Sequence, residues 1–258
     1  MSTAPYLRYV AIGDSTTEGL EDRYPDGGFR GWADRLAERL DALGADVRYA
    51  NLAIRGRKVA RISDEQLEPA LAMAPDLASV VGGINDILRP KVDLDHVAGH
   101  IERMVAALRA GGATVLMMTY PDPAKVMPVA RGTSHRVLAF DDALREIAAR
   151  HGARLVDLAH YGTADARLLH PDRLHANSEG HRRIAEAAAE TLGLPGATAG
   201  WHDPLPSAKQ APIPAVVARE VAWTATYLVP WVGRRLRGRS SGDGVAPKRP
   251  RLMPVHPG

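Results

Sequence analysis

The chain contains no cysteine among its 258 residues. This absence excludes structural disulfides, cysteine-ligated zinc, iron–sulfur clusters and a cysteine nucleophile. Any covalent catalysis must therefore use an oxygen or nitrogen nucleophile. The phosphate-cradling patterns Gly-x-x-x-x-Gly-Lys-Ser/Thr and Gly-x-Gly-x-x-Gly are also missing, so the sequence gives no support to a nucleotide-binding function.

The chain has little net charge, and the distribution of its charged residues along the sequence is more informative than the total. The formal net charge is +3, but residues 1–200 carry 24 basic against 27 acidic side chains, while residues 201–258 carry 9 against 3. The basic character thus belongs to the carboxyl-terminal part alone. We expect no nucleic-acid partner for the body, because such partners require a basic surface.

Long hydrophobic runs are lacking as well. The amino-terminal residues show neither a basic region nor a small-residue cleavage site, which predicts a cytoplasmic location. In the carboxyl-terminal part, the longest uncharged run covers residues 221–233. That run is shorter than the roughly 20 residues that span a bilayer, so a transmembrane helix is disfavoured.

Short β-branched runs alternate with longer helical patterns over the first 200 residues. This alternation predicts a parallel sheet covered by helices on both faces. The expected strands cover residues 9–12, 47–51, 77–81, 114–119 and 154–157, and the expected helices cover residues 31–43, 59–73, 94–110, 135–151 and 178–192. Because ligands of such sheets bind outside the carboxyl ends of the strands, the residues after each strand are the candidates for a site.

Three strand ends carry residues that suit acyl chemistry. Ser15 follows the first strand in Gly-Asp-Ser, where a helix amino terminus favours negative charge. Gly56, after the second strand, lets a backbone N–H approach a ligand. Asn85, after the third, can donate to an oxyanion. Each has a plainer interpretation: helix capping for Ser15, and a turn for Gly56 and Asn85.

A further candidate pair lies near the end of the alternating region. Asp172 and His175 stand three residues apart, so both can face one site, with Asp172 orienting the imidazole. His170 and His181 flank the pair, and we expect surface or packing roles for both, with His170 alternatively lining the entrance. Together with Ser15, Gly56 and Asn85, the pair supplies a nucleophile, oxyanion donors and an oriented base.

The sequence resembles the SGNH hydrolases, also called GDSL-type esterases or lipases. The resemblance rests on four blocks in order: Gly-Asp-Ser at Ser15, Asn-x-Ala-x-x-Gly ending at Gly56, Gly-x-Asn-Asp at Asn85, and Asp-x-x-His at Asp172 and His175. It covers about residues 7–192 and implies a three-layer α/β/α, flavodoxin-like fold with a five-stranded parallel sheet. One departure is Thr16, where the family usually has leucine.

The resemblance also implies a mechanism and a set of roles. Ser15 would be the nucleophile, His175 the general base and Asp172 its orienting carboxylate. The backbone N–H groups of Ser15 and Gly56 and the side chain of Asn85 would form the oxyanion hole. The expected function is hydrolysis of carboxylic esters of short to medium acyl chain. Acyl transfer or deacetylation by the same triad, or an idle binding protein of the same fold, are the alternatives.

The sequence says less about which residues bind the substrate and whether a metal is needed. Tyr120, Val126 and Met127, after the fourth strand, are candidates for an apolar acyl wall, although they would equally pack the loop. We expect no cofactor and no metal: His96 and His100 have helical spacing but lack the glutamate of the zinc-protease pattern. The expected partner is a small-molecule ester.

The chain divides by composition into three parts. Residues 1–194 form the hydrolase domain, residues 195–239 a proline-rich linker with an accessory helix over residues 215–232, and residues 240–258 a basic tail predicted to be disordered. The accessory helix has apolar residues on one face and is expected to dock on the body or a partner subunit. Contact with a membrane surface or an acidic partner are the alternatives.

Overall fold

The central element of the computed structural model is a twisted sheet with the strand order β5-β4-β3-β1-β2-β6. The structure describes residues 6–44, 46–161, 164–207, 212–230, 233 and 240–255. The first five strands pair in parallel. They are β1 (Arg8–Gly13), β2 (Arg48–Asn51), β3 (Leu77–Val81), β4 (Thr114–Met118) and β5 (Arg154–Val156). The predicted α/β fold with a parallel sheet is confirmed, with boundaries within two residues of those expected.

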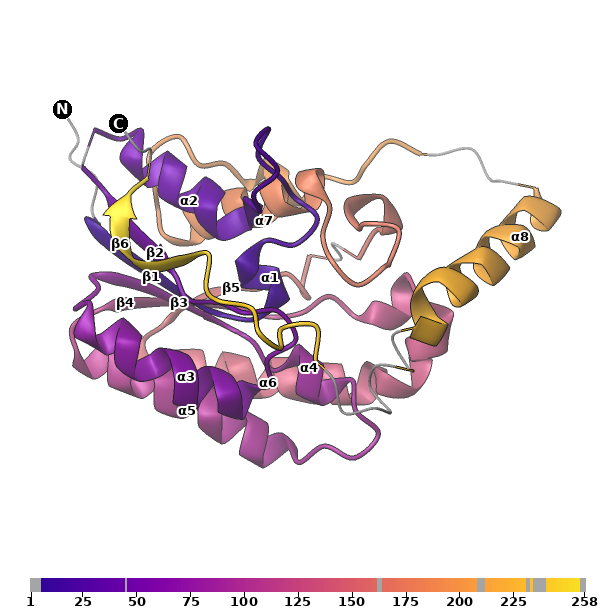
Figure 1. Cartoon of the computed structure of the whole chain (residues 1–258), viewed down its shortest axis with the longest axis horizontal. Helices are drawn as coiled ribbons and strands as arrows, with labels where there is room; N and C mark the ends of the chain where they lie inside the picture. Colours follow the sequence, from indigo (N-terminus) through magenta and orange to yellow (C-terminus); the bar gives the residue numbers. More distant parts are fainter. Residues whose placement is uncertain are drawn as a thin grey trace.

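Helices cover both faces of this sheet (Figure 1). On one face lie α2 (Gly31–Asp41) and α7 (Ser178–Thr191), and on the other lie α3 (Val59–Ala72), α5 (Leu94–Ala110) and α6 (Ser134–His151). Short helices fill the connections: α1 (Ser15–Glu18), α4 (Ile84–Ile87), η1 (Pro123–Lys125), η2 (Pro128–Thr133), η3 (Ala166–Leu168) and η4 (Ala199–His202). The order of the parallel strands is that of flavodoxin-like folds, whose ligand site lies at the β1/β3 switch point.

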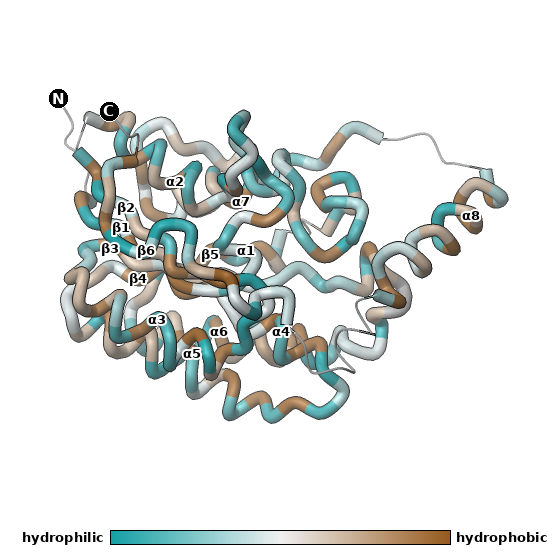
Figure 2. Tube along the Cα trace, viewed as in Figure 1, coloured by the Kyte–Doolittle hydropathy of each residue, from teal (hydrophilic) through white to brown (hydrophobic). Residues whose placement is uncertain are grey.

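The core follows from the apolar pattern of the strands and helices. Every residue of β3 is buried, as a strand covered on both faces requires. On α2, Trp32, Leu36 and Leu40 share one face and are fully buried. In Figure 2 hydrophobic and hydrophilic positions alternate along the helices, as expected for elements that have one buried face.

A buried histidine joins the two helices on one face of the sheet. His181 on α7 accepts a hydrogen bond at Nδ1 from the backbone N–H of Trp32 (3.1 Å). Its Nε2 lies 2.9 Å from the carbonyl oxygen of Leu20, so Nε2 carries the proton and donates it there. Burial holds the pKa of His181 down, to about 4. The packing role expected for His181 is the one it has.

A sixth strand corrects the expectation of disorder for residues 240–258. β6 (Arg249–Pro254) pairs antiparallel with β2, with Tyr49 opposite Met253 and Asn51 opposite Arg249. The preceding Lys248 inserts its ammonium group against the carboxylate of Asp34 and the carbonyl oxygens of Phe29 and Arg30. Disorder was predicted from the Gly, Pro and Arg content, but strand pairing and a buried ion pair fix residues 240–255 on the body. Residues 256–258 lie outside the described residues.

The accessory helix of the carboxyl-terminal part is present and reaches away from the body (Figure 1). It comprises α8 (Ile213–Trp223), which continues as a π-helical turn, η5 (Thr224–Leu228). Residues 231 and 232, the end of the predicted helix, lie outside the described residues. Among the helices that the structure describes, none is sufficiently long and apolar to cross a membrane.

Candidate active site

Ser15 stands at the point where β1 turns into α1. The side chain of Asp14 caps α1 by accepting a hydrogen bond from the backbone N–H of Thr16 (3.1 Å). The end of β1 is clamped by Gln66 on α3, whose amide both accepts from Gly13 N–H (2.8 Å) and donates to the Gly13 carbonyl (2.9 Å). Gln66 is a residue that sequence reasoning missed, because a lone glutamine in a helix carries no motif. The clamp fixes the backbone directly before Ser15.

Ser15, His175 and Asp172 form a continuous hydrogen-bonded chain. His175 Nε2 lies 3.0 Å from Ser15 Oγ, and His175 Nδ1 lies 2.7 Å from Asp172 Oδ2. Because an ionised carboxylate only accepts, Nδ1 carries the imidazole proton and Nε2 is left to accept the serine hydroxyl. The structure thus brings together three side chains separated by up to 160 positions in the sequence.

The Asp172–His175 loop is shaped by its own backbone. A bridge pairs Leu169 with Ala176, and the His170 N–H donates to the His175 carbonyl (2.8 Å). Within this loop Asp172 Oδ1 accepts from the backbone N–H groups of Leu174 (2.9 Å) and His175 (3.0 Å). Although burial alone would raise the pKa of Asp172, the hydrogen bond and charge of His175 and these N–H donors lower it. Asp172 is therefore held as a carboxylate.

Asn85 and Asp14 connect the β3 loop with the serine loop. Asn85 is the second residue of α4, and its Nδ2 donates to Asp14 Oδ2 (3.1 Å) and to the Arg57 carbonyl (3.2 Å). Burial raises the pKa of Asp14 to about 6. Asp86 accepts from Val59 N–H (2.9 Å), so both aspartates brace loops.

Gly56 lies on the loop after β2, beneath residues of the carboxyl-terminal segment. It has a left-handed backbone (φ +71°), and a Cβ added to it would come within 2.5 Å of Ser240 Oγ. Ser240 lies 3.3 Å from the Gly56 carbonyl and donates its hydroxyl there. A substitution at Gly56 would therefore strain its backbone and displace the segment.

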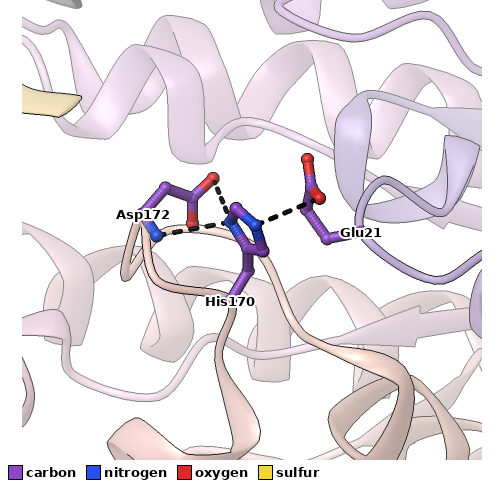
Figure 3. A group of neighbouring side chains, drawn as sticks. All are labelled: Glu21, His170 and Asp172. Carbon is purple, nitrogen blue, oxygen red and sulfur yellow. Dashed lines mark hydrogen bonds and ion pairs between the residues drawn. The ribbon is translucent and has the colours of Figure 1, made fainter. Parts of the chain in front are cut away.

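His170 and Glu21 lie beside the triad carboxylate (Figure 3). His170 Nδ1 accepts from the Asp172 N–H (3.3 Å), and His170 Nε2 faces Glu21 Oε2 at 3.3 Å. The ligand atoms of Glu21, His170 and Asp172 all fall within 4.8 Å, a spacing that would suit a metal ion. However, the Asp172 oxygen nearest His170 is also the one bonded to His175, so a metal there would compete with the triad.

An apolar cavity of about 280 Å³ adjoins Asp172 and His175. From the body it is lined by Leu88, Met127, Ala130, Thr133 and Leu174. Of the three residues proposed for an acyl wall, Met127 is in this lining and Val126 is not. Tyr120 is also outside it: the ring is buried in the core, stacked on Phe140. Tyr120 comes two residues after the end of the buried β4, and sequence alone does not show which way the chain turns there.

The comparison with protein families gives a clear result. The profile of the GDSL-like Lipase/Acylhydrolase family matches residues 11–183. The chain belongs to this family. The GDSL match spans all five residues discussed for the triad and oxyanion hole, and it ends before α8 and β6.

Solved structures of similar fold agree with this membership. TesA is 25% identical over 72% of this chain and 97% of its own, with a TM-score of 0.61. LAE5, an alpha/beta hydrolase from the metagenome of Lake Arreo, is 22% identical over 72% and 95%, with a TM-score of 0.62. Axe2, an acetylxylan esterase from Geobacillus stearothermophilus, is 22% identical over 73% and 94%, with a TM-score of 0.61. No curated protein sequence matches the chain.

Proposed function

We propose that this GDSL hydrolase cleaves carboxylic esters through an acyl-enzyme on Ser15. The observation that carries the proposal is the chain of two hydrogen bonds from Ser15 Oγ through His175 to Asp172. A serine hydroxyl is a weak nucleophile until an adjacent base takes its proton. The distances of 3.0 and 2.7 Å are within the reach that general base catalysis requires.

The reaction divides into two acyl transfers. Ser15 Oγ attacks the ester carbonyl carbon while its proton moves to His175 Nε2, and the same proton then leaves with the alcohol as the C–O bond breaks. Water next attacks the acyl-serine, giving its proton to His175, which returns it to Ser15 Oγ as the carboxylic acid departs. Asp172 stabilises the imidazolium that forms in each half.

The negative charge on the carbonyl oxygen needs donors near the serine. The backbone N–H groups of Ser15 and Gly56 and Asn85 Nδ2 are the proposed donors. Asn85 would turn a hydrogen bond now made to Asp14 or to the Arg57 carbonyl towards the oxyanion. Removal of one such donor typically lowers kcat by about 10²–10³-fold. The proposal gains support from Axe2, whose described catalytic mutants replace a serine, an aspartate and a histidine with alanine.

The test is the variant Ser15→Ala, assayed with p-nitrophenyl acetate and followed by release of carboxylic acid. We expect kcat to fall by at least about 10⁴-fold, because the oxyanion donors alone retain little of the rate. Ser207→Ala, which removes an exposed serine, is the matched control and should keep the wild-type rate. Full hydrolysis by Ser15→Ala, or failure of a fluorophosphonate to label Ser15 in the wild-type protein, would overturn the proposal.

A further inference from the structure

The cavity next to His175 has a second wall, which comes from the carboxyl-terminal helix. Trp223 at the end of α8 and Tyr227 and Leu228 on η5 complete the lining begun by Leu88, Met127 and Leu174. These three residues follow the GDSL match, which ends at residue 183. One side of the cavity is therefore supplied by a part of this chain outside the family profile.

Specific contacts hold the helix against the loop that carries the triad. Arg173 donates two hydrogen bonds of 2.6 Å to the carboxylate of Glu220 on α8. Its guanidinium also lies over the ring of Trp223, 4.6 Å from the ring centre. Arg173 has a left-handed backbone (φ +60°), an unfavourable conformation for a residue with a side chain, which these contacts help to hold.

Two aromatic residues extend the attachment to the triad loop itself. Trp223 Nε1–H donates to the carbonyl oxygen of Asp172 at 3.3 Å, and the ring of Trp223 is buried. The ring of Tyr227 meets that of His170 edge-on, with 6.1 Å between centres. The helix thus contacts positions 172 and 173 of the loop between His170 and His175. Its position relative to His175 is set by these contacts.

The composition of the cavity indicates what it holds. Leucine, methionine, alanine and aromatic side chains dominate the lining, while Thr133, Asp172 and His175 supply its main polar atoms. A charged or hydroxyl-rich group would lose its hydrogen bonds to water there without replacement. A hydrocarbon chain attached to a carbonyl at Ser15 gives up no hydrogen bonds there and removes apolar surface from water.

The size of the cavity limits the length of that chain. A volume of about 280 Å³ lies near the lower end of the range for small-molecule sites. A methylene group occupies about the volume of a water molecule, roughly 30 Å³, so complete filling would take about nine carbons. Because the cavity is open on one side and a chain fills it incompletely, we expect a chain of about six to eight carbons. Longer chains would have to leave through its open side.

We propose that the helix formed by α8 and η5 is the specificity element of this enzyme, closing an acyl site for unbranched chains of about six to eight carbons. The inference rests on the proposed ester hydrolysis at Ser15 and names its substrate class. Each methylene that enters the cavity raises kcat/KM by about fourfold until the space is full. Activity should rise from acetyl to octanoyl esters and level off beyond them.

The experiment compares p-nitrophenyl acetate, hexanoate, octanoate and laurate below the concentrations at which the esters aggregate. Leu228 is changed in two directions: Leu228→Ala widens the cavity and Leu228→Trp fills it. The measured quantity is the ratio of kcat/KM for octanoate to that for acetate. We expect both variants to lower this ratio by about tenfold, because one loses contacts with the chain and the other blocks it.

The matched control is Val229→Ala, one position along, where the side chain is 60% exposed and outside the cavity lining. It should keep the wild-type ratio, and unfolding curves identify any variant that fails to fold. Wild-type preference for acetate over octanoate, or ratios within about twofold of wild type in both Leu228 variants, would overturn the inference. The two tests are separate. If Ser15→Ala abolishes ester hydrolysis, the proposed function holds even when the chain-length experiment contradicts the inference.

Discussion

Asp14, next to Ser15 in the sequence, and Asp172, hydrogen-bonded to His175, have opposite electrostatic surroundings. Asp14 is fully buried and its pKa is raised by that burial to about 6, whereas the pKa of Asp172 is lowered below its ordinary value. Asp172 accepts two backbone N–H groups in addition to His175, and these donors favour its charged form. Asp172 can therefore stabilise an imidazolium, while Asp14 serves the loop.

His181 leads to a prediction about stability and pH. Burial depresses its pKa in the folded protein to about 4, below the value near 6.5 of an unfolded chain. Between these values the unfolded state binds a proton that the folded state does not. The contribution of His181 to the free energy of unfolding is therefore at its full value above pH 6.5 and decreases as the pH falls towards 4.

The variant His181→Gln tests this, because glutamine offers both an acceptor for Trp32 N–H and a donor for Leu20 without titrating. Between pH 7.5 and 5.0, the wild-type free energy of unfolding should fall by about 2 kcal/mol more than that of the variant. Urea denaturation at the two pH values measures the difference. His96→Gln, an exposed position on α5, is the control, and equal pH dependence in wild type and His181→Gln would contradict the prediction.

At the scale of elements, the attachment of β6 depends on one buried ion pair. The side chains of Lys248 and Asp34 are 17% and 3% exposed. Burial raises the pKa of Asp34 and lowers that of Lys248, opposed in each case by the partner's charge. Removal of one partner leaves the other charge buried, which typically costs about 3–5 kcal/mol.

We therefore expect Lys248→Met to lower the free energy of unfolding by about 3 kcal/mol, measured by chemical denaturation. In the double variant Lys248→Met/Asp34→Asn the buried charge is gone, and most of the loss should be recovered. Lys91→Met, at an exposed lysine, should have little effect. A double variant as unstable as Lys248→Met would show that packing, and not charge, dominates.

The elements that sequence predicts well are those with strong apolar patterns. Residues 77–81 and 94–110 form β3 and α5 with the expected bounds, because a buried apolar run and an amphipathic period each specify one structure. β6 was missed, since two prolines and two arginines in six residues are unlike a strand. Its stability comes from β2 and Asp34, which are about 200 residues away in the sequence.

The candidate site divides in the same way. The sequence indicates Ser15 and Asn85 because each sits in a short motif after a strand, and Asp172 and His175 because of their Asp-x-x-His spacing. The fold brings these side chains together at one place. The cavity wall formed by Trp223 and Leu228 was not predicted, because these residues reach it through a tertiary contact that no local pattern records. Motifs identify reacting groups, whereas pocket walls depend on how remote segments pack.

For the molecule as a whole, two basic residues of the carboxyl-terminal part, Lys248 and Arg249, are engaged with the protein itself. Lys248 is paired with Asp34, and Arg249 donates to the carbonyls of Pro254 and Val255 while its guanidinium lies over the ring of Tyr49. These two charges are therefore less available to a partner than composition alone suggests. These contacts lie where β6 meets the rest of the protein.

Antiparallel pairing with β6 covers the edge of β2, which would otherwise be open. An uncovered strand edge is a template for pairing with another chain, and β6 occupies that edge of β2. β6 in turn is a poor template, because Pro250 and Pro254 have no N–H to donate and Arg249 and Arg251 repel an identical strand. Its unusual composition is thus suited to the outermost position in the sheet.

Deletion of residues 240–258 should consequently convert the protein into a self-associating one, with β2 free to pair between copies. Sedimentation velocity over a range of concentrations measures this, with Lys248→Met as a control that weakens the strand's anchor but leaves the strand in place. A truncated protein that stays as dispersed as wild type would refute the idea. The basic segment, which composition suggests is there to attract a partner, is on this reasoning what keeps identical molecules apart.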